Sequence, residues 1–222
     1  MSASESLQEP WAEPPAYIKF LRKHIWVIGI LFFFLMITLM RPFLIRRPPA
    51  PEVIGEVPAF SLVDQSGESF TREDLLAADK TYVVGFVFTS CPSICPAISR
   101  AMLMFQEQIE RSKLSDRVEL ITVTVDPETD SPTVLRAYAE RHHADLGGWS
   151  FLTGSPEQVR ATITRGFLVP IGEREDTPGG YDILHTSQLM LIDDQHRLRG
   201  LYPTDADGMA AMERDVARLL AE

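Results

Sequence analysis

Cysteine is scarce in this sequence, and several common catalytic motifs are missing from it. There are two cysteines among 222 residues. We find no Gly-rich phosphate loop, no Ser-His-Asp order and no paired-carboxylate motif, so nothing favours those classes of enzyme. Basic residues are also outnumbered, with 21 Lys and Arg against 31 Asp and Glu. This acidic balance argues against nucleic acid as a partner and allows a basic protein partner.

The remaining composition is that of one globular domain with an N-terminal appendage. A chain of this length with 45% hydrophobic residues can bury one core of ordinary size. Residues 1–23 are polar and contain several acidic residues and prolines, so we expect a disordered tail. They do not resemble a mitochondrial transit peptide, which would be Arg-rich and poor in acidic residues.

A single long apolar run follows this tail. Residues 25–40 carry no charge and would span about 24 Å as a helix, short of the roughly 30 Å hydrocarbon core of a bilayer. Extension to Ile45 completes the span if the Arg41 side chain reaches the interface. We therefore predict one transmembrane anchor over residues 24–45 and a stiff Pro-rich linker over residues 46–55. A cleaved signal peptide is the alternative, but no small-x-small cleavage site follows the run.

The charges that flank the apolar run do not decide its orientation. Three basic residues lie close to it on each side, so the positive-inside rule gives no answer. The cysteines give a chemical argument instead, because thiols that cycle with a disulfide or an exported metal belong outside the cytoplasm. We expect a single-pass protein of the bacterial inner membrane with its C-terminal domain on the periplasmic side.

Both cysteines lie where a buried strand gives way to a helix. Residues 81–89 are mostly apolar, β-branched or aromatic, which is typical of a strand buried on both faces of a parallel sheet. Pro96 has no N–H and fits the first turn of the next helix, which places the helix start near residues 93–94. Cys91 is then in the loop and Cys95 in the first turn. Both sulfurs face the positive end of the helix dipole, which favours the thiolate.

The pair is therefore predicted to be a reactive dithiol, a pair of ligands for a soft metal, or both. Two other interpretations are weaker. Buried cysteines are often inert, but two of them at a strand-to-helix corner bracketed by prolines are not typical of that class. A purely structural disulfide would close so short a loop that it would add little stability.

The rest of the domain alternates strands and helices. A hairpin is predicted over residues 59–70, and a strand over 117–125 is expected parallel to the first core strand. Residues 167–183 are predicted to be a long functional loop. It leads to a strand over 186–192, which is joined by a tight turn to a partner over 196–202. The fold class is α/β, with a central mixed sheet flanked by helices.

The strand ends bring candidate ligands together. Cys91 and Asp126 follow the two parallel strands and therefore lie at the same edge of the sheet. If the strand over 186–192 runs antiparallel to them, His185 at its start meets the two thiols. Two thiolates and an imidazole suit Cu(I) and can hold Cu(II), whereas zinc would take the same ligands with a water. We expect Asp126 to support the ligands or to cap a helix.

Four segments resemble the signature blocks of the SCO/SenC family, in the same order and spacing. They are residues 88–96, 125–127, 149–154 and 182–185. Each block alone is a weak signal, but the joint match is specific and covers roughly residues 56–221. One departure is the pair Ser93 and Ile94, which replaces the family's more usual acidic residue or Thr followed by Val.

The resemblance implies a thioredoxin-like copper-binding domain over residues 56–222, held on a single membrane anchor. It implies that copper is bound by Cys91, Cys95 and His185, with Asp126 near the metal. It further implies a role in delivering copper to, or reducing the cysteines of, the binuclear copper site in cytochrome c oxidase subunit II. Other copper chaperones or thiol reductants are further expected partners.

A thiol-disulfide oxidoreductase is the alternative function, with Cys91 as the attacking thiol and Cys95 as the resolving thiol. Thioredoxins use C-x-x-C and place a cis-proline opposite it. This chain has three residues between its cysteines and places Leu184, His185 and Thr186 at the opposite position. The sequence therefore favours metal binding, and a metallochaperone rather than an enzyme, although both activities can coexist.

Overall fold

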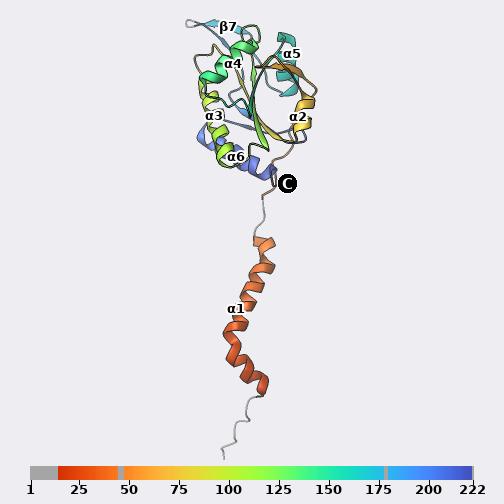
Figure 1. Ribbon diagram of the computed structural model, residues 1–222, viewed down its shortest axis with the longest axis vertical. Coiled ribbons are helices and arrows are strands. Elements are labelled where there is room, and N and C mark those ends of the chain that lie inside the picture. Colours follow the sequence, from red (N-terminus) through yellow and green to blue (C-terminus); the bar gives the residue numbers. More distant parts are fainter. Residues whose placement is uncertain (1–14, 45–47, 178–179, 222) are drawn as a thin grey trace, which may run out of the picture. The chain divides into compact units, whose positions relative to one another are not determined.

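The computed structural model describes residues 15–44, 48–177 and 180–221. The chain divides into two compact units, Met1–Pro48 and Pro49–Glu222, and each is described by itself. Figure 1 follows the elements along the chain. The helices are α1 Ala16–Leu44, α2 Arg72–Ala78, α3 Cys95–Arg111, α4 Pro132–Arg141, α5 Pro156–Ala161, the π-helical turn η1 Thr162–Gly166 and α6 Ala206–Leu219. The strands are β1 Gly55–Glu56, β2 Ser61–Asp64, β3 Ser69–Thr71, β4 Thr81–Val87, β5 Val118–Thr124, β6 Trp149–Thr153, β7 Arg174–Thr177, β8 Gly180–Ile183, β9 Leu189–Ile192 and β10 Arg197–Tyr202.

The first unit contains helix α1. Its stretch Ala16–Arg41 has a mean hydropathy of 2.0 and is long and apolar enough to cross a membrane. The helix begins at Ala16, so the expectation of a disordered tail is wrong for residues 16–23, and residues 1–14 lie outside the described part. The helix can begin this early because the carbonyl of Pro15 accepts hydrogen bonds from the first turn and because no Gly or Pro follows before Gly29.

The second unit is built on an eight-stranded mixed sheet in the order β1-β10-β9-β4-β5-β6-β2-β3. Strands β4, β5 and β6 run parallel, and β9 runs antiparallel to β4. The predicted N-terminal hairpin is β2–β3, and it extends the sheet beyond β6. Helices flank this sheet (Figure 1). The hydrophobic core lies wholly within this unit, from Val57 to Leu219, so the unit has what a domain needs to fold alone.

Local signals in the sequence explain where the helices begin. Ser131 precedes α4, and its side chain accepts a hydrogen bond from the N–H of Val134. Ser155 and Gln158 form a reciprocal capping box at the start of α5. Helix α3 begins at Cys95 with a proline in its first turn, close to the predicted position.

The predicted strand over residues 186–192 is antiparallel to β4, as expected, but it begins only at Leu189. The residues before it bond locally instead of joining the ladder. The N–H of Gln188 donates to Oγ1 of Thr186, and Nδ1 of His185 donates to the Thr186 carbonyl. Such side-chain bonds compete with strand pairing. His185 therefore lies in a short irregular segment at the edge of the sheet.

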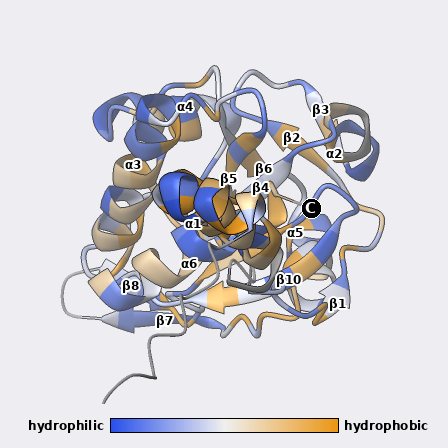
Figure 2. Ribbon diagram, turned by 90° about the horizontal axis from the view of Figure 1, so that it is seen from below, coloured by the Kyte–Doolittle hydropathy of each residue, from blue (hydrophilic) through white to orange (hydrophobic). Residues whose placement is uncertain are grey.

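The segment over residues 167–183, predicted to be a loop, contains strands β7 and β8, which form a separate two-stranded sheet. All four residues of β7 are exposed, and the strand is mostly hydrophilic (blue in Figure 2). It therefore lacks the apolar alternation that would have revealed a strand in the sequence. Contacts from Tyr181, described below, hold this hairpin in place.

A buried ion-pair cluster closes the β9–β10 turn. Asp193 is 2% exposed, and its Oδ2 accepts from Nε of Arg197 at 2.8 Å and from Nε of Arg199 at 2.6 Å. Burial alone would raise the pKa of Asp193, but the hydrogen bonds from Arg197 and Arg199 outweigh it and the pKa is lowered. Because the folded-state pKa is depressed, the stabilisation is present above the ordinary Asp pKa and is lost as the pH falls through the folded value.

We expect Asp193→Asn to lower the free energy of unfolding of residues 49–222 by about 3 kcal/mol at pH 7, because it leaves two arginines without their buried partner. Urea unfolding measures the change. Asp194→Asn, at an exposed neighbour, is the matched control. The difference in the free energy of unfolding between wild type and Asp193→Asn should become smaller as the pH falls below the ordinary Asp pKa. A difference that stays constant down to low pH would contradict the assignment.

Candidate metal centre

Two free thiols mark the edge of the sheet where β4 ends. Cys91 lies in the loop after β4 and Cys95 is the first residue of α3, as predicted, and their exposures are 7% and 0%. The N–H of Cys91 donates to the carbonyl of Phe88, which turns the chain sharply at the end of the strand. The sulfurs are therefore placed by a tight turn and by the helix start.

The two thiols differ in acidity, which corrects the expectation that both favour the thiolate. Burial raises the pKa of Cys91, but hydrogen bonds from Ser93 and Cys95 outweigh it, so the pKa is lowered. The Ser93 Oγ lies 3.5 Å from the Cys91 sulfur. Burial raises the pKa of Cys95 far above its ordinary value, and the neighbouring Cys91 raises it further. Cys91 is therefore the more acidic thiol of the pair, and Cys95 keeps its proton.

The structure brings His185 to the thiols. Its Nε2 lies 3.7 Å from the Cys95 sulfur, and its Nδ1 lies 2.8 Å from the Thr186 carbonyl oxygen. Because a carbonyl can only accept, Nδ1 carries the proton and Nε2 presents its lone pair to the sulfur. Burial lowers the pKa of His185, so the imidazole is neutral at pH 7. This is the form that binds metals.

Asp126 lies beside the dithiol loop but does not cap a helix. The cap of the following helix α4 is Ser131. Asp126 is 5% exposed, and its Oδ2 accepts a hydrogen bond from the hydroxyl of Tyr181. The same hydroxyl lies 2.7 Å from Oγ of Ser90, the residue before Cys91. Asp126 is thus connected to the thiols through Tyr181, as a supporting group.

The three candidate ligands are neighbours without yet forming a closed metal site. His185 contacts Cys95, and Cys91 is near enough to raise the pKa of the Cys95 thiol. Within the described ranges, no three His, Cys, Asp or Glu side chains are already gathered tightly enough to hold a metal ion. A site that used all three side chains would need them closer together than they are here. Cys91 and His185 lie outside regular strands and helices, whereas Cys95 is fixed in α3.

Asp130, which no pattern in the sequence singles out, is completely buried. Its Oδ2 accepts from the backbone N–H of Thr89 at 3.1 Å and from the Thr124 hydroxyl at 2.5 Å, and its Oδ1 accepts from the Thr89 hydroxyl at 2.5 Å. It thereby joins the loop that leads to Cys91 to the end of β5. Burial raises the pKa of Asp130, and the three hydrogen bonds only partly offset this.

Aromatic rings also surround the site in a way that the sequence did not reveal. The ring of Phe88 stacks on Tyr181, with centroids 5.5 Å apart and planes 22° from parallel. It meets the ring of His185 edge-on, at 6.1 Å and 83°. Phe88 is completely buried at the end of the core run, so the pattern suggested core packing alone.

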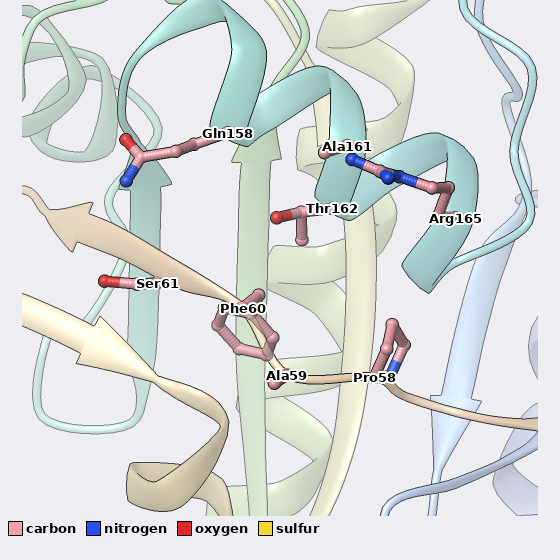
Figure 3. Close-up of a pocket in the computed structure, with 8 residues that line it drawn as sticks. All are labelled: Pro58, Ala59, Phe60, Ser61, Gln158, Ala161, Thr162 and Arg165. Atoms are coloured by element: carbon pink, nitrogen blue, oxygen red, sulfur yellow. The ribbon is translucent and has the colours of Figure 1, made fainter.

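A cleft of about 410 Å³ lies elsewhere, between the segment before β2 and the end of α5. Phe60 lines one side, and Thr162 and Arg165 of η1 line the other (Figure 3). It shares no lining residue with the dithiol site. The thiols are therefore not part of this cleft.

Comparison with known proteins decides the family. A family model described as SCO1/SenC matches residues 50–221. The chain belongs to the SCO1/SenC family. One relative is the SCO2-like protein of Rickettsia felis, which is 28% identical over 197 residues that cover 84% of this chain and 90% of that protein.

Solved structures of SCO1/SenC proteins share the fold. Arabidopsis thaliana ScoI, solved with copper bound, is 25% identical with a TM-score of 0.62 and covers 75% of this chain and 99% of its own. BsSco is described as having a disulfide switch and as a member of the Sco family of cytochrome c oxidase assembly proteins. BsSco is 23% identical with a TM-score of 0.67, and the match covers 78% of this chain and 98% of BsSco. This likeness shows the fold alone. The predicted thioredoxin-like fold is confirmed.

We expect Asp130→Ala to lower the free energy of unfolding of residues 49–222 by about 3 kcal/mol, because it leaves three donors, one of them fully buried, without their acceptor. Asp130→Asn is the matched variant. Its Oδ1 can replace the carboxylate Oδ2, and its amide can donate to Oγ1 of Thr89, so its loss should stay near 1 kcal/mol.

The pH dependence of the stability of wild type and Asp130→Asn tests whether the pKa of Asp130 is raised. Because the folded-state pKa of Asp130 is raised, its carboxyl favours folding at low pH, and this contribution is lost as the pH rises through the folded value. Urea unfolding across pH 4 to 8 should show the stability of Asp130→Asn improving relative to wild type with rising pH. Equal stability of Asp130→Ala and wild type at every pH would contradict the role of this carboxylate.

Proposed function

We propose that this chain is a membrane-anchored copper metallochaperone that serves the assembly of cytochrome c oxidase. The observation that carries the proposal is the lone pair of His185 Nε2, which faces the Cys95 sulfur at 3.7 Å beside a second thiol. Family membership supports the proposal, since one Sco protein is solved with copper and another is described as an oxidase assembly protein. In this function copper is the ion that is delivered.

The donor set fits copper by its chemistry. Two sulfurs and one neutral imidazole are soft donors in low number, which suits Cu(I), and they can also hold Cu(II). We assign Cys91, Cys95 and His185 as ligands. Asp126 supports them through Tyr181 and does not bind the ion itself, because a carboxylate matches Cu(I) poorly. Metal binding displaces the proton that Cys95 keeps in the metal-free protein.

The proposed acceptor is the binuclear copper site of cytochrome c oxidase subunit II. Handover proceeds by ligand exchange, in which acceptor thiolates replace the ligands on the ion one at a time. Other copper chaperones supply the ion, and thiol reductants keep Cys91 and Cys95 reduced. Oxidation of the Cys91 and Cys95 thiols to a disulfide transfers two electrons to an oxidant and releases two protons. The disulfide leaves no thiolate for copper.

Anchoring by α1 completes this proposal. We assign residues 24–45 as the membrane anchor, residues 46–55 as the linker and residues 56–222 as the copper-binding domain. The domain faces the periplasm of a bacterial inner membrane, where an exported metal and a dithiol-disulfide cycle are both available. Support comes from the length and hydropathy of α1 and from the reactive pair.

A second function is favoured by the unequal acidity of the thiols. The Cys91 thiolate attacks a disulfide of the acceptor, and one acceptor sulfur leaves as a thiolate. Cys95 then loses its proton and attacks Cys91 in the mixed disulfide, which releases the second acceptor thiol and forms the Cys91–Cys95 disulfide. This reaction prepares the acceptor cysteines for copper, so it complements delivery of the metal.

We expect His185→Ala to abolish the thiolate-to-Cu(II) absorption band of residues 49–222 and to weaken Cu(I) binding at least tenfold in chelator competition, because one of three donors is lost. His143→Asn is the control, since this exposed histidine has a φ of 58°, which Asn tolerates. An unchanged band and affinity in His185→Ala would remove His185 from the site.

We expect alkylation by iodoacetamide at pH 7 to be at least tenfold faster at Cys91 than at Cys95, because the pKa of Cys91 is lowered and that of Cys95 is raised. The single variants Cys95→Ser and Cys91→Ser allow each thiol to be followed alone by mass spectrometry. Ser93→Ala, which removes a hydrogen bond to the Cys91 sulfur, should shift the pH profile of Cys91 upward. Faster reaction at Cys95 would reverse the assigned roles.

A further inference from the structure

The hydroxyl of Tyr181 joins three segments of the chain beside the thiols. Because the carboxylate of Asp126 can only accept, the Tyr181 hydroxyl donates to it and accepts from Ser90, whose Oγ is 2.7 Å away. Tyr181 belongs to β8, Asp126 follows β5, and Ser90 precedes Cys91. One hydroxyl thus bridges the hairpin, the end of a core strand and the dithiol loop.

The ring of Tyr181 is held as firmly as its hydroxyl. It stacks on the buried ring of Phe88 at 5.5 Å between centroids. The guanidinium carbon of Arg174, on β7, lies 3.5 Å from the centroid of the Tyr181 ring. The same Phe88 ring contacts His185 edge-on. Tyr181 therefore fixes the hairpin against the surface on which the histidine rests.

The segment that carries His185 has little other support. Leu184 is 79% exposed, and residues 184–188 belong to no strand. The N–H of Gly172 donates to the Leu184 carbonyl at 2.7 Å, but Gly172 precedes the same hairpin. A two-stranded hairpin is at best marginally stable by itself. The position of the histidine therefore depends on what holds the hairpin to the domain.

We propose that Tyr181 is a positioning residue for His185, acting by holding the β7–β8 hairpin against Asp126 and Ser90. The inference rests on the proposed function, in which His185 is a copper ligand. In the metal-free protein Tyr181 limits the conformations of residues 184–188, and it thereby lowers the entropic cost of bringing the imidazole to the metal. Tyr181 itself does not bind the ion.

The first experiment needs no metal. In residues 49–222, Tyr181→Phe keeps the ring but removes the hydroxyl, and amide hydrogen exchange of Gly172 is followed by NMR. We expect exchange at Gly172 to rise about tenfold, because a hydrogen bond to a charged acceptor is lost. Tyr202→Phe is the matched control. The Tyr202 hydroxyl also donates to a carboxyl group, that of Asp215 at 2.7 Å, but Tyr202 lies on β10 of the eight-stranded sheet and not on the β7–β8 hairpin.

The second experiment is a double-mutant cycle on Cu(I) affinity, measured by chelator competition. Tyr181→Phe should weaken binding about three- to tenfold when His185 is present, and Tyr202→Phe should leave it unchanged. In a His185→Ala background, Tyr181→Phe should have no further effect, because Tyr181 acts only through His185. A residue that merely stabilised the domain would weaken binding equally in both backgrounds.

The outcomes separate the inference from the proposed function. Unchanged exchange at Gly172, unchanged Cu(I) affinity in Tyr181→Phe, or an equal loss of affinity in both backgrounds would each overturn the positioning role. If His185→Ala alone binds Cu(I) as wild type does, the assigned ligand set fails, and the positioning role fails with it. Faster exchange at Gly172 together with loss of affinity only when His185 is present supports both.

Discussion

The antiparallel pairing of β9 with β4 is the constraint on which the site depends. Because the two strands run in opposite directions, the end of β4 and the start of β9 meet at one edge of the sheet. The pairs Val83↔Leu191 and Val84↔Met190 belong to this register, and all four residues are buried. Cys95 and His185 come within 3.7 Å across this edge, although they lie far apart in the sequence. Every proposal about copper follows from that meeting.

Polar contacts then adjust what the sheet brings together. Asp130 fixes the approach to the dithiol loop from one side, and Tyr181 fixes the hairpin from the other. Burial and hydrogen bonding separate the pKa values of the two sulfurs, so that Cys91 is the more acidic thiol and Cys95 stays neutral. The same arrangement serves both proposed activities, because a thiolate with a protonated neighbour can receive an ion or attack a disulfide. The scaffold fixes positions, and local contacts set reactivity.

Much of this arrangement could be predicted from the sequence. The apolar runs of β4 and β5 and the order strand, helix, strand predicted the sheet and the edge that holds the thiols. The hairpin β7–β8 could not be predicted, because an exposed polar strand has no alternating pattern. Asp130 and Tyr181 also escaped notice, since nothing in the sequence shows which partners the fold will place beside a polar side chain. The acidity of Cys95 depends on burial in the same way.

The separation of β7–β8 from the main sheet has a consequence for divergence within the family. These strands pair only with each other among the described elements, so insertions or deletions between them would leave the eight-stranded ladder intact. The connection between the two strands can therefore change in length without disturbing the ladder, provided that Tyr181, one residue into β8, and the residues that lead to the histidine are kept. Members of the family can thereby acquire new recognition surfaces on this hairpin without losing the thiols and the histidine.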